Sequence, residues 1–347
     1  MTSLIPNFTR NQISKSGDAL INASLPPIAH AEALLLINHW RACHVYPMKT
    51  FQATLRKRLK KVCDSPLVAQ RLKRVPSIVK KLEKNQGMQL ARMQDIGGIR
   101  AVVNNINQVR KLQETYTNGS LTHDLIGVDD YIANPKASGY RSVHVIFKYK
   151  NLTETAYNGL FIELQLRTNL QHAWATAVET IGSFLNQALK SSEGSDEWLD
   201  FFKLVGAAFA IMEDSPVASE FKGCSPAKIY KLCTEQEVRL DVKRKLQSFA
   251  VAANAITSEK NGGNYHLIIL DANDRTVSIS SFGKKRLEEA NKEYAQAEKV
   301  ALENTDVQVV LVATDSVDSL RRAYPNYFLD TKQFVLALNR IKKLADQ

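Results

Sequence analysis

Residues 160–167, LFIELQLR, alternate between apolar and polar side chains, as in a β-strand with two unlike faces. Glu163, Gln165 and Arg167 fall on one face of this predicted strand. Burying that face in an apolar core would leave charges unpaired, which costs several kcal/mol. A solvated strand surface and the floor of a cleft are the two alternatives, and the pattern favours the cleft.

A second strand is predicted upstream, over residues 99–104 (IRAVVN), which are short, apolar and β-branched. It follows Asp95 and the pair Gly97-Gly98, which permits a tight bend or a close backbone approach. Asp95 would then stand at a strand entrance and could meet Glu163 of a neighbouring strand. Two carboxylates from separate strands of a basic chain predict Mg²⁺ held for a phosphate substrate. Turn capping is the alternative role for Asp95.

The loop at residues 135–144 (PKASGYRSVH) lies between these strands in the sequence. Tyr140 offers a planar face for a base, and Gly139 gives the loop freedom. An aromatic ring with cationic neighbours is a recurring way to hold a nucleotide. The polar neighbours in this loop are Lys136, Ser138, Arg141 and His144.

A basic run precedes both strands. The chain has 46 Lys and Arg against 35 Asp and Glu, a net charge of +11, which favours polyanionic partners. Within the run, residues 71–81 (RLKRVPSIVKK) lead into a predicted helix from about Ser77 to Lys84. The start of a helix welcomes phosphate through its free N–H groups and dipole. A solvated helix face is the alternative for this run.

The rest of the pattern predicts an α/β fold with two parts. Helices are expected at about 27–59, with an interruption at Pro47, and at 106–116 and 170–190, with a strand over about 140–150. The turn-rich EKNGGN at 259–264 separates this part from a small α/β module. In that module, strands are expected at 265–270, 276–281 and 307–313 and helices at 284–302 and 330–344. The predicted domains are therefore 1–256 and 257–347.

Targeting signals are lacking in the sequence. No stretch is apolar enough for a membrane span or a signal peptide, so a cytoplasmic location without membrane partners is expected. Cys224 and Cys233 lack the spacing of a zinc site, and no structural zinc is expected.

Four motifs together resemble the RelA/SpoT synthetase domain, in the family's order, over about residues 45–190. They are RLKRVPSIVKK, DIGGIR, KASGYRSVH and IELQLRT. The resemblance implies a nucleotidyltransferase-like mixed sheet flanked by helices. It also implies a pyrophosphokinase that uses ATP and Mg²⁺.

The resemblance assigns roles to individual residues. The catalytic residues would be Asp95, Glu163 and Gln165, with Asp95 and Glu163 also binding the metal. ATP would be bound by Arg71 and Arg100 at the adenine and by Lys73, Ser77 and Lys81 at the phosphates. The acceptor would be bound by Lys136, Ser138, Tyr140, Arg141, His144 and Arg167.

Members of this family differ in their acceptor, which is GDP or GTP in alarmone synthetases and the 3′ end of tRNA in a toxic subgroup. The charge excess favours tRNA, because binding a mononucleotide requires fewer positive charges. NFTRNQISKSGDALI and INHWRACHVYPMKTFQ also resemble the fused toxin–antitoxin members known as CapRel.

The CapRel resemblance concerns the C-terminal part of the chain. It implies a degenerate zinc-finger-like C-terminal domain that silences the enzyme. Tyr324 and Tyr327 of YPNYF would fill the ATP pocket, and a phage capsid protein would release them. Packing before the final helix is the alternative role for this pair.

Two further alternatives come from other classes. One is a catalytically silent RNA-binding module with the same fold, against which the presence of Asp95 and Glu163 argues. The other is a nucleotidyltransferase that releases pyrophosphate, whose Asp-x-Asp signature is missing near the expected strand.

Overall fold

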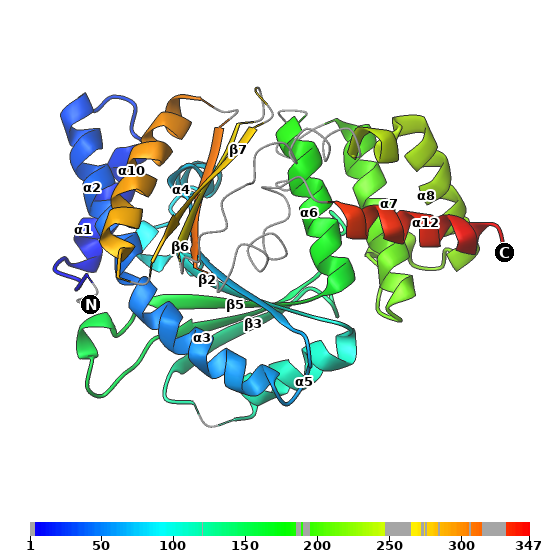
Figure 1. Ribbon diagram of the computed structural model, residues 1–347, viewed down its shortest axis with the longest axis horizontal. Coiled ribbons are helices and arrows are strands. Elements are labelled where there is room, and N and C mark those ends of the chain that lie inside the picture. Colours follow the sequence, from blue (N-terminus) through cyan, green and yellow to red (C-terminus); the bar gives the residue numbers. More distant parts are fainter. Residues whose placement is uncertain are drawn as a thin grey trace.

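A computed structural model describes residues 4–119, 121–184, 189, 195–246, 265–271, 274, 276–283, 285–304, 307–313 and 331–347. The strands form one large mixed sheet, and the helices lie around that sheet (Figure 1). The strands of the first part are β1 Leu67–Leu72, β2 Gly97–Val103, β3 Asp124–Asp130, β4 Val143–Lys148 and β5 Phe161–Thr168. β2 and β5 run parallel, and the other neighbours in this part are antiparallel. The predicted mixed α/β fold is confirmed.

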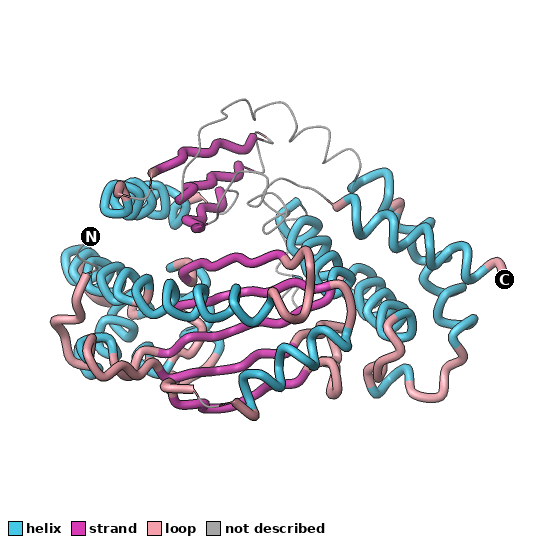
Figure 2. Tube along the Cα trace, turned by 60° about the horizontal axis from the view of Figure 1, so that its bottom comes forward, coloured by secondary structure: helices cyan, strands magenta, loops and turns pink. Residues whose placement is uncertain are grey.

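Helices pack around this sheet. α3 and α5 cover one face (Figure 2). The main helices are α1 Arg10–Ile21, α2 Pro27–Cys43, α3 Val45–Leu59, α4 Val75–Lys84, α5 Ile106–Thr117, α6 Asn169–Phe184, α7 Asp196–Met212, α8 Pro226–Leu240, α10 Leu287–Glu303 and α12 Lys332–Ala345.

The glycine pair lies inside β2 and forms no bend. Neither glycine has a positive φ, so of the two predicted alternatives the tight bend is wrong and the close approach remains. A Cβ on Gly97 would lie 3.0 Å from Ile162 Cδ1 and 3.1 Å from Met48 Sδ, so Gly97 lets α3 approach the back of the sheet. Gly98 faces the opposite side of the sheet. Because it has no side chain, it leaves space between the side chains of its partners on β1 and β5.

The sheet continues beyond the first five strands. β6 Tyr265–Asp271, β7 Thr276–Phe282 and β8 Val307–Ala313 lie close to where strands were predicted. β8 pairs with β1 at Gln70↔Ala313 and Arg71↔Val312, which gives the order β3-β4-β5-β2-β1-β8-β6-β7. The sheet therefore crosses the predicted domain boundary.

The last helix lies away from β6–β8. Phe334 of α12 is fully buried against a cluster of aromatic side chains from α7. Its ring centroid lies 5.9 Å from that of Phe209 and 6.1 Å from that of Phe202. α12 was expected in the C-terminal module, but the structure places it with α6, α7 and α8 (Figure 1).

Two other expectations on the fold differ from the structure. The predicted helix over 27–59 is interrupted at His44, where α2 and α3 meet, and not at Pro47, which lies in the first turn of α3; His44 Nδ1 bonds the carbonyl of Trp40 at 2.9 Å. β1 and β3 were not predicted as strands, since they lie in a basic run and an acidic turn-rich segment.

In the part of the chain that is described, none of the helices has the length and apolar character to span a membrane.

Candidate functional site

The strand register brings most of the predicted site residues onto one face of the sheet. Residues directly opposite one another across neighbouring strands share a face. Gly98 lies opposite both Arg71 and Glu163, and Arg100 lies opposite Gln165. Gln165 in turn lies opposite His144 of β4. The shared face therefore carries Arg71, Arg100, His144, Glu163, Gln165 and Arg167.

Five side chains of this face and of the adjoining loop form a closed ring of hydrogen bonds. Arg167 donates to the Tyr140 hydroxyl at 2.6 Å and to Gln165 Oε1 at 3.1 Å. Gln165 donates to Glu163 Oε2 at 2.8 Å. His144 closes the ring, with Nδ1 2.8 Å from Glu163 Oε1 and Nε2 2.7 Å from the Tyr140 hydroxyl. The ring fixes the Glu163 carboxylate against the Tyr140 loop.

The ring also sets the charges of its members. Burial acts to lower the pKa of His144, but the neighbouring Tyr140 hydroxyl and Glu163 carboxylate outweigh it and raise that pKa to about 9. Burial acts to raise the pKa of Glu163, and the hydrogen bond from His144 outweighs it, so this pKa is lowered. Both effects favour an ion pair of protonated His144 with ionised Glu163 at neutral pH.

Asp95 stands beside Glu163 on the other side of the face, next to β1 and α4. Its carboxylate accepts from Lys73 Nζ at 2.7 Å and from Lys81 Nζ at 3.0 Å. Burial opposes ionisation, yet the two ammonium groups hold the pKa of Asp95 down at about 2. Ser77 lies one turn before Lys81 on α4, so these two predicted phosphate residues share one helix face, while Lys73 lies between β1 and α4.

The two carboxylates fit a magnesium ion. The negative charge of Asp95 acts to raise the pKa of Glu163, although the contacts of Glu163 with His144 outweigh it. No cluster of three or more His, Cys, Asp and Glu side chains suited to a metal occurs among the described residues. Mg²⁺ typically uses one or two carboxylates and completes its shell with water and substrate phosphates. Asp95 and Glu163 would hold it in that way.

Tyr131 also belongs to this site, although the sequence did not single it out. Its ring lies edge-on to His144 at 5.3 Å and to Tyr140 at 6.0 Å. Lys136 Nζ stands over the Tyr131 ring at 4.2 Å and over the Tyr140 ring at 5.7 Å. The signal in the sequence was the aromatic residue at the end of β3, a strand that was not predicted.

The Tyr140 loop is held from behind by α7. Gly139 has a φ of +86° and caps a turn in which its N–H donates to the carbonyl of Lys136 at 2.9 Å. A Cβ on Gly206 of α7 would lie 2.7 Å from both Gly139 Cα and Gly139 O. Only a pair of glycines permits this approach. Ser138, within the turn, is half-buried.

Arg141 points toward α7 and is only 4% exposed. Its guanidinium donates to Glu213 Oε2 at 2.9 Å and to Ser215 Oγ at 2.7 Å. Glu213 also accepts from Gln171 at 3.1 Å and from the hydroxyl of Thr168. Arg141 is thus part of a buried network beneath the loop, rather than one of the side chains that face the predicted acceptor.

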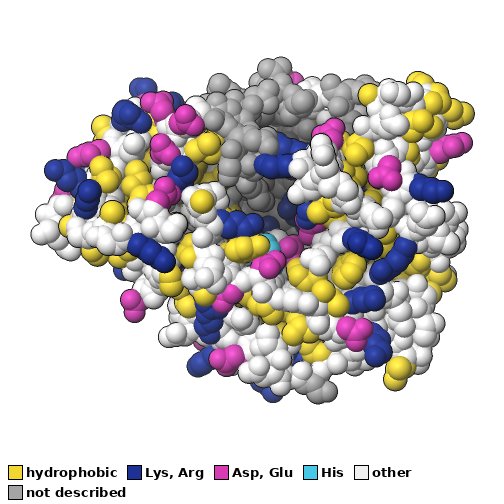
Figure 3. Space-filling model, turned by 180° about the vertical axis from the view of Figure 1, so that it is seen from behind, with side chains coloured by type: hydrophobic (Ala, Val, Ile, Leu, Met, Phe, Trp, Pro, Cys, Tyr) yellow, Lys and Arg dark blue, Asp and Glu magenta, His cyan; other side chains and the backbone are white. Residues whose placement is uncertain are grey.

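One face of the molecule is hollowed, and Lys and Arg side chains gather inside the hollow with acidic side chains and a histidine (Figure 3). Tyr324 and Tyr327, predicted to fill the ATP pocket, lie outside the described residues.

The fold and site define an α/β protein that gathers cations around two carboxylates on one sheet face. Residues 70–182 match the family described as the region found in RelA / SpoT proteins. This stretch holds β2 to β5 and all the predicted catalytic, ATP-binding and acceptor-binding residues. The chain therefore carries a region homologous to the RelA/SpoT pyrophosphokinases.

Two curated relatives share this region. The chain is 33% identical over 113 residues to the GTP pyrophosphokinase YjbM of Bacillus subtilis (strain 168). It is 32% identical over 107 residues to a GTP pyrophosphokinase of Haemophilus influenzae. The stretches cover 31% and 29% of this chain, and 52% and 12% of the relatives. The chain thus spans about half the length of the first relative.

Parts of this chain also resemble solved structures. Small alarmone synthetase 1 from Bacillus subtilis, bound to its product pppGpp, is 20% identical, with a TM-score of 0.43. The match covers 50% of this chain and 90% of that one. A GTP pyrophosphokinase family protein from Streptococcus pneumoniae is 23% identical, with a TM-score of 0.43, over 50% of this chain and 87% of that one.

Proposed function

We propose that this chain transfers pyrophosphate from ATP to the 3′-hydroxyl at the acceptor end of tRNA and thereby blocks translation. One observation carries the proposed reaction. Glu163 lies between a set of cations around Asp95 on one side and the Tyr140 loop on the other. A phosphate donor and a base-bearing acceptor would therefore meet at Glu163.

In the proposed reaction, the ribose hydroxyl oxygen attacks the β-phosphorus of ATP. The bond from that phosphorus to the oxygen bridging the α- and β-phosphates breaks, and AMP leaves with the bond's electron pair. Glu163, kept ionised by His144, accepts the hydroxyl proton. Lys73 and Lys81 neutralise the phosphates, so catalysis rests on positioning and charge stabilisation.

Mg²⁺ bound by Asp95 and Glu163 would neutralise charge on the phosphates when present. Arg71 and Arg100 lie on neighbouring strands as diagonal neighbours of one face. Their guanidinium groups are proposed to hold the adenine between them. Tyr140, with Lys136 and Tyr131 beside it, would stack on the acceptor base.

The choice of tRNA rests on charge and on the N-terminal resemblance to CapRel. A net charge of +11 suits a polyanion better than a mononucleotide. A second candidate is synthesis of (p)ppGpp from GDP or GTP, and the names of both curated relatives favour it. Both candidates use the same residues around Glu163.

Autoinhibition by the C-terminal region is also part of this proposal, with Tyr324 and Tyr327 in the ATP pocket and a phage capsid protein as the trigger. The pairing of β8 with β1 at Arg71 supports it, because the C-terminal region is bonded to a strand that carries a predicted adenine contact. Release would be a shift between closed and open populations.

The deciding experiment incubates the purified full chain with labelled ATP and either uncharged tRNA or GDP. The Tyr324→Ala, Tyr327→Ala double variant is assayed in parallel to remove the proposed block. Label on the tRNA 3′ end together with AMP release supports the proposal. Label on GDP alone assigns the second candidate, and release of pyrophosphate instead of AMP rejects pyrophosphate transfer. Equal activity and ATP affinity of wild type and double variant would reject the block.

A further inference from the structure

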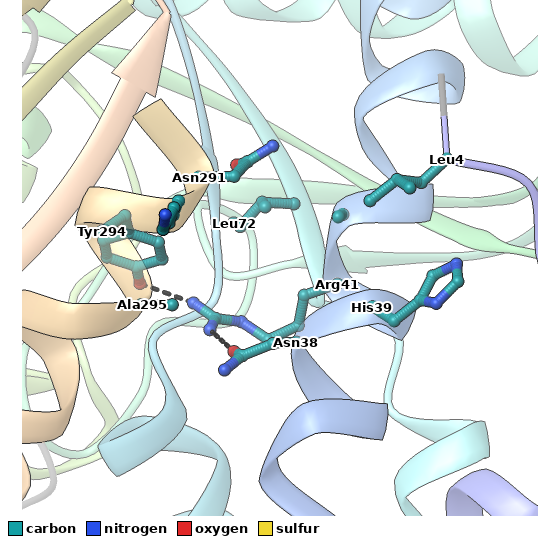
Figure 4. Close-up of a pocket in the computed structure, with 10 residues that line it drawn as sticks. Leu4, Asn38, His39, Arg41, Leu72, Asn291, Tyr294 and Ala295 are labelled. Carbon is teal, nitrogen blue, oxygen red and sulfur yellow. Dashed lines mark hydrogen bonds between the residues drawn. The ribbon is translucent and has the colours of Figure 1, made fainter. Parts of the chain in front are cut away.

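α10 is fastened to the synthetase region by a buried ion pair. Arg41 of α2 donates to Glu298 Oε2 of α10 at 2.7 Å, and the two side chains are only 2% and 4% exposed. The Tyr294 hydroxyl donates to Glu298 Oε1 at 2.8 Å and accepts from Arg41. Figure 4 shows the Arg41 guanidinium between Asn38 of its own helix and Tyr294 of the opposite one.

The same two side chains also contact the start of α4. Arg41 Nε donates to the carbonyl of Lys73 at 2.7 Å. Glu298 Oε1 accepts from the backbone N–H of Val75, the first residue of α4, at 2.7 Å. The residue before α4, Arg74, supplies no side-chain cap. The first N–H of this helix is therefore satisfied by a carboxylate 223 positions later in the chain.

Apolar packing is incomplete at this junction. A pocket of about 250 Å³ lies beside the ion pair, and its lining includes His39 of α2, Asn291 of α10 and Leu72 of β1 (Figure 4). The walls of this open pocket do not pack against each other. The hydrogen bonds of Glu298 join α10 directly to α2 and to the start of α4 at this junction.

We propose that Glu298 is an internal anion that latches α10 shut and occupies the α4 N-terminus until α10 leaves. In the closed state the carboxylate uses an N–H that a phosphate oxygen of ATP could otherwise bind. When α10 leaves, the Val75 N–H and the Arg41 guanidinium become available to that phosphate. ATP and closure then compete for one anion position beside Lys73. This inference rests on the proposed function, since it concerns the same ATP site.

Glu298→Gln in the full chain is the direct test, because it keeps the shape and removes the charge. A buried pair that loses one partner is strongly weakened, so the open population should rise about tenfold or more. Two readouts follow. The dissociation constant for a non-hydrolysable ATP analogue should fall about tenfold, and hydrogen exchange should quicken at the β8 and α10 amides.

Two companion variants make the result specific. Tyr294→Phe removes only the hydroxyl that donates to Glu298, and should shift both readouts in the same direction by less. Glu289→Gln is the matched control on α10, because Glu289 is exposed and its ion pair among the described residues is with Arg286, the residue just before this helix. It should leave both readouts unchanged.

The outcomes separate the latch from the proposed function. Faster exchange at β8 with unchanged nucleotide affinity would overturn the competition, as would unchanged exchange in Glu298→Gln. Tighter nucleotide binding with no transfer to tRNA or GDP would keep the latch and reject the proposed reaction. Transfer that is the same in wild type and Glu298→Gln, with equal nucleotide affinity, would keep the reaction and reject the latch.

Discussion

His144 Nδ1 lies 2.8 Å from Glu163 Oε1, so the predicted base has a buried cationic partner on the neighbouring strand. The sequence placed His144 among the acceptor contacts. The structure gives it a second task, because its other ring nitrogen bonds the Tyr140 hydroxyl. His144 therefore connects the base to the loop that would carry the acceptor.

Replacing His144 by Gln should separate these tasks. Gln keeps hydrogen-bonding capacity but loses the charge that holds Glu163 ionised. We expect kcat to fall by about ten- to a hundredfold, less than the roughly 10²–10⁴-fold expected on loss of the base itself through Glu163→Gln. Steady-state AMP release measures both variants. An unchanged kcat for His144→Gln would contradict the positioning role.

The same pair predicts a pH dependence of stability. The pKa of His144 is raised to about 9, so its contribution is complete below its ordinary value near 6.5 and is lost as pH rises through about 9. The lowered pKa of Glu163 acts at the other end, since its contribution is lost as pH falls below its ordinary range. Urea unfolding at several pH values should show wild type losing its advantage over His144→Gln between about pH 7 and 10. A constant difference would argue against the pair.

Gly206→Ala tests the contact between α7 and the Tyr140 loop. Helix propensity alone predicts a gain of about 1 kcal/mol for Ala over Gly. The new Cβ would lie 2.7 Å from Gly139 backbone, so we expect instead a loss of about 1–3 kcal/mol and a raised KM for the acceptor. Gly127→Ala is the control, because nothing lies within 4 Å of its Cβ position. A stabilised Gly206→Ala protein would show that the close approach does not exist.

Arg141→Met should act on stability rather than on acceptor binding. It would leave Glu213 buried without its cation, which costs about 3–5 kcal/mol. At a temperature where the variant remains folded, KM for the acceptor should change less than for Arg167→Met. Thermal unfolding and acceptor titration give the two quantities. A normal unfolding temperature with a large rise in KM would return Arg141 to the acceptor site.

Phe334→Ala tests whether α12 packs with α6, α7 and α8. Truncating this buried ring should cost about 3–5 kcal/mol, while Leu336→Ala, at a position 60% exposed, should cost little. Chemical denaturation measures both. Equal losses would place α12 outside the core.

The position of α12 also changes how autoinhibition is tested by deletion. A chain ending at residue 256 lacks α12 and uncovers Phe201 and Phe202. Removing 257–330 and rejoining the chain spares α12 and isolates the proposed inhibitory part. Growth arrest on expression of this internal deletion, with a harmless full chain, is the expected outcome. A harmless deletion beside a toxic full chain would contradict autoinhibition.

The sequence was most informative where side-chain alternation and chemistry coincide. The period of LFIELQLR placed Glu163, Gln165 and Arg167 on one face, and the structure has them there. β1 was not predicted, because its arginine belongs to a basic run that indicates phosphate binding rather than strand pairing. Its partners, β2 and β8, lie far away in sequence, and no local pattern encodes such pairing.

Contacts between distant segments account for the rest. Arg141 resembles its neighbours in the loop in sequence, and only its ion pair with Glu213, the residue after α7, reveals its buried role. Glu298 is likewise one of several acids on a charged helix. Its contact with Arg41 exists only because the chain returns to α2. Charge and period therefore predict the centre of the site, but not the supports behind it.

The pairing of β8 with β1 has a consequence for the lifetime of any open state. A strand at the rim of a sheet presents unpaired N–H and C=O groups, which other chains can join. Detachment of β8 would turn β1, at Gln70 and Arg71, from an inner strand into such a rim. An activated molecule would then be prone to aggregation and to capture by chaperones or proteases. The open, active state would therefore have a limited lifetime.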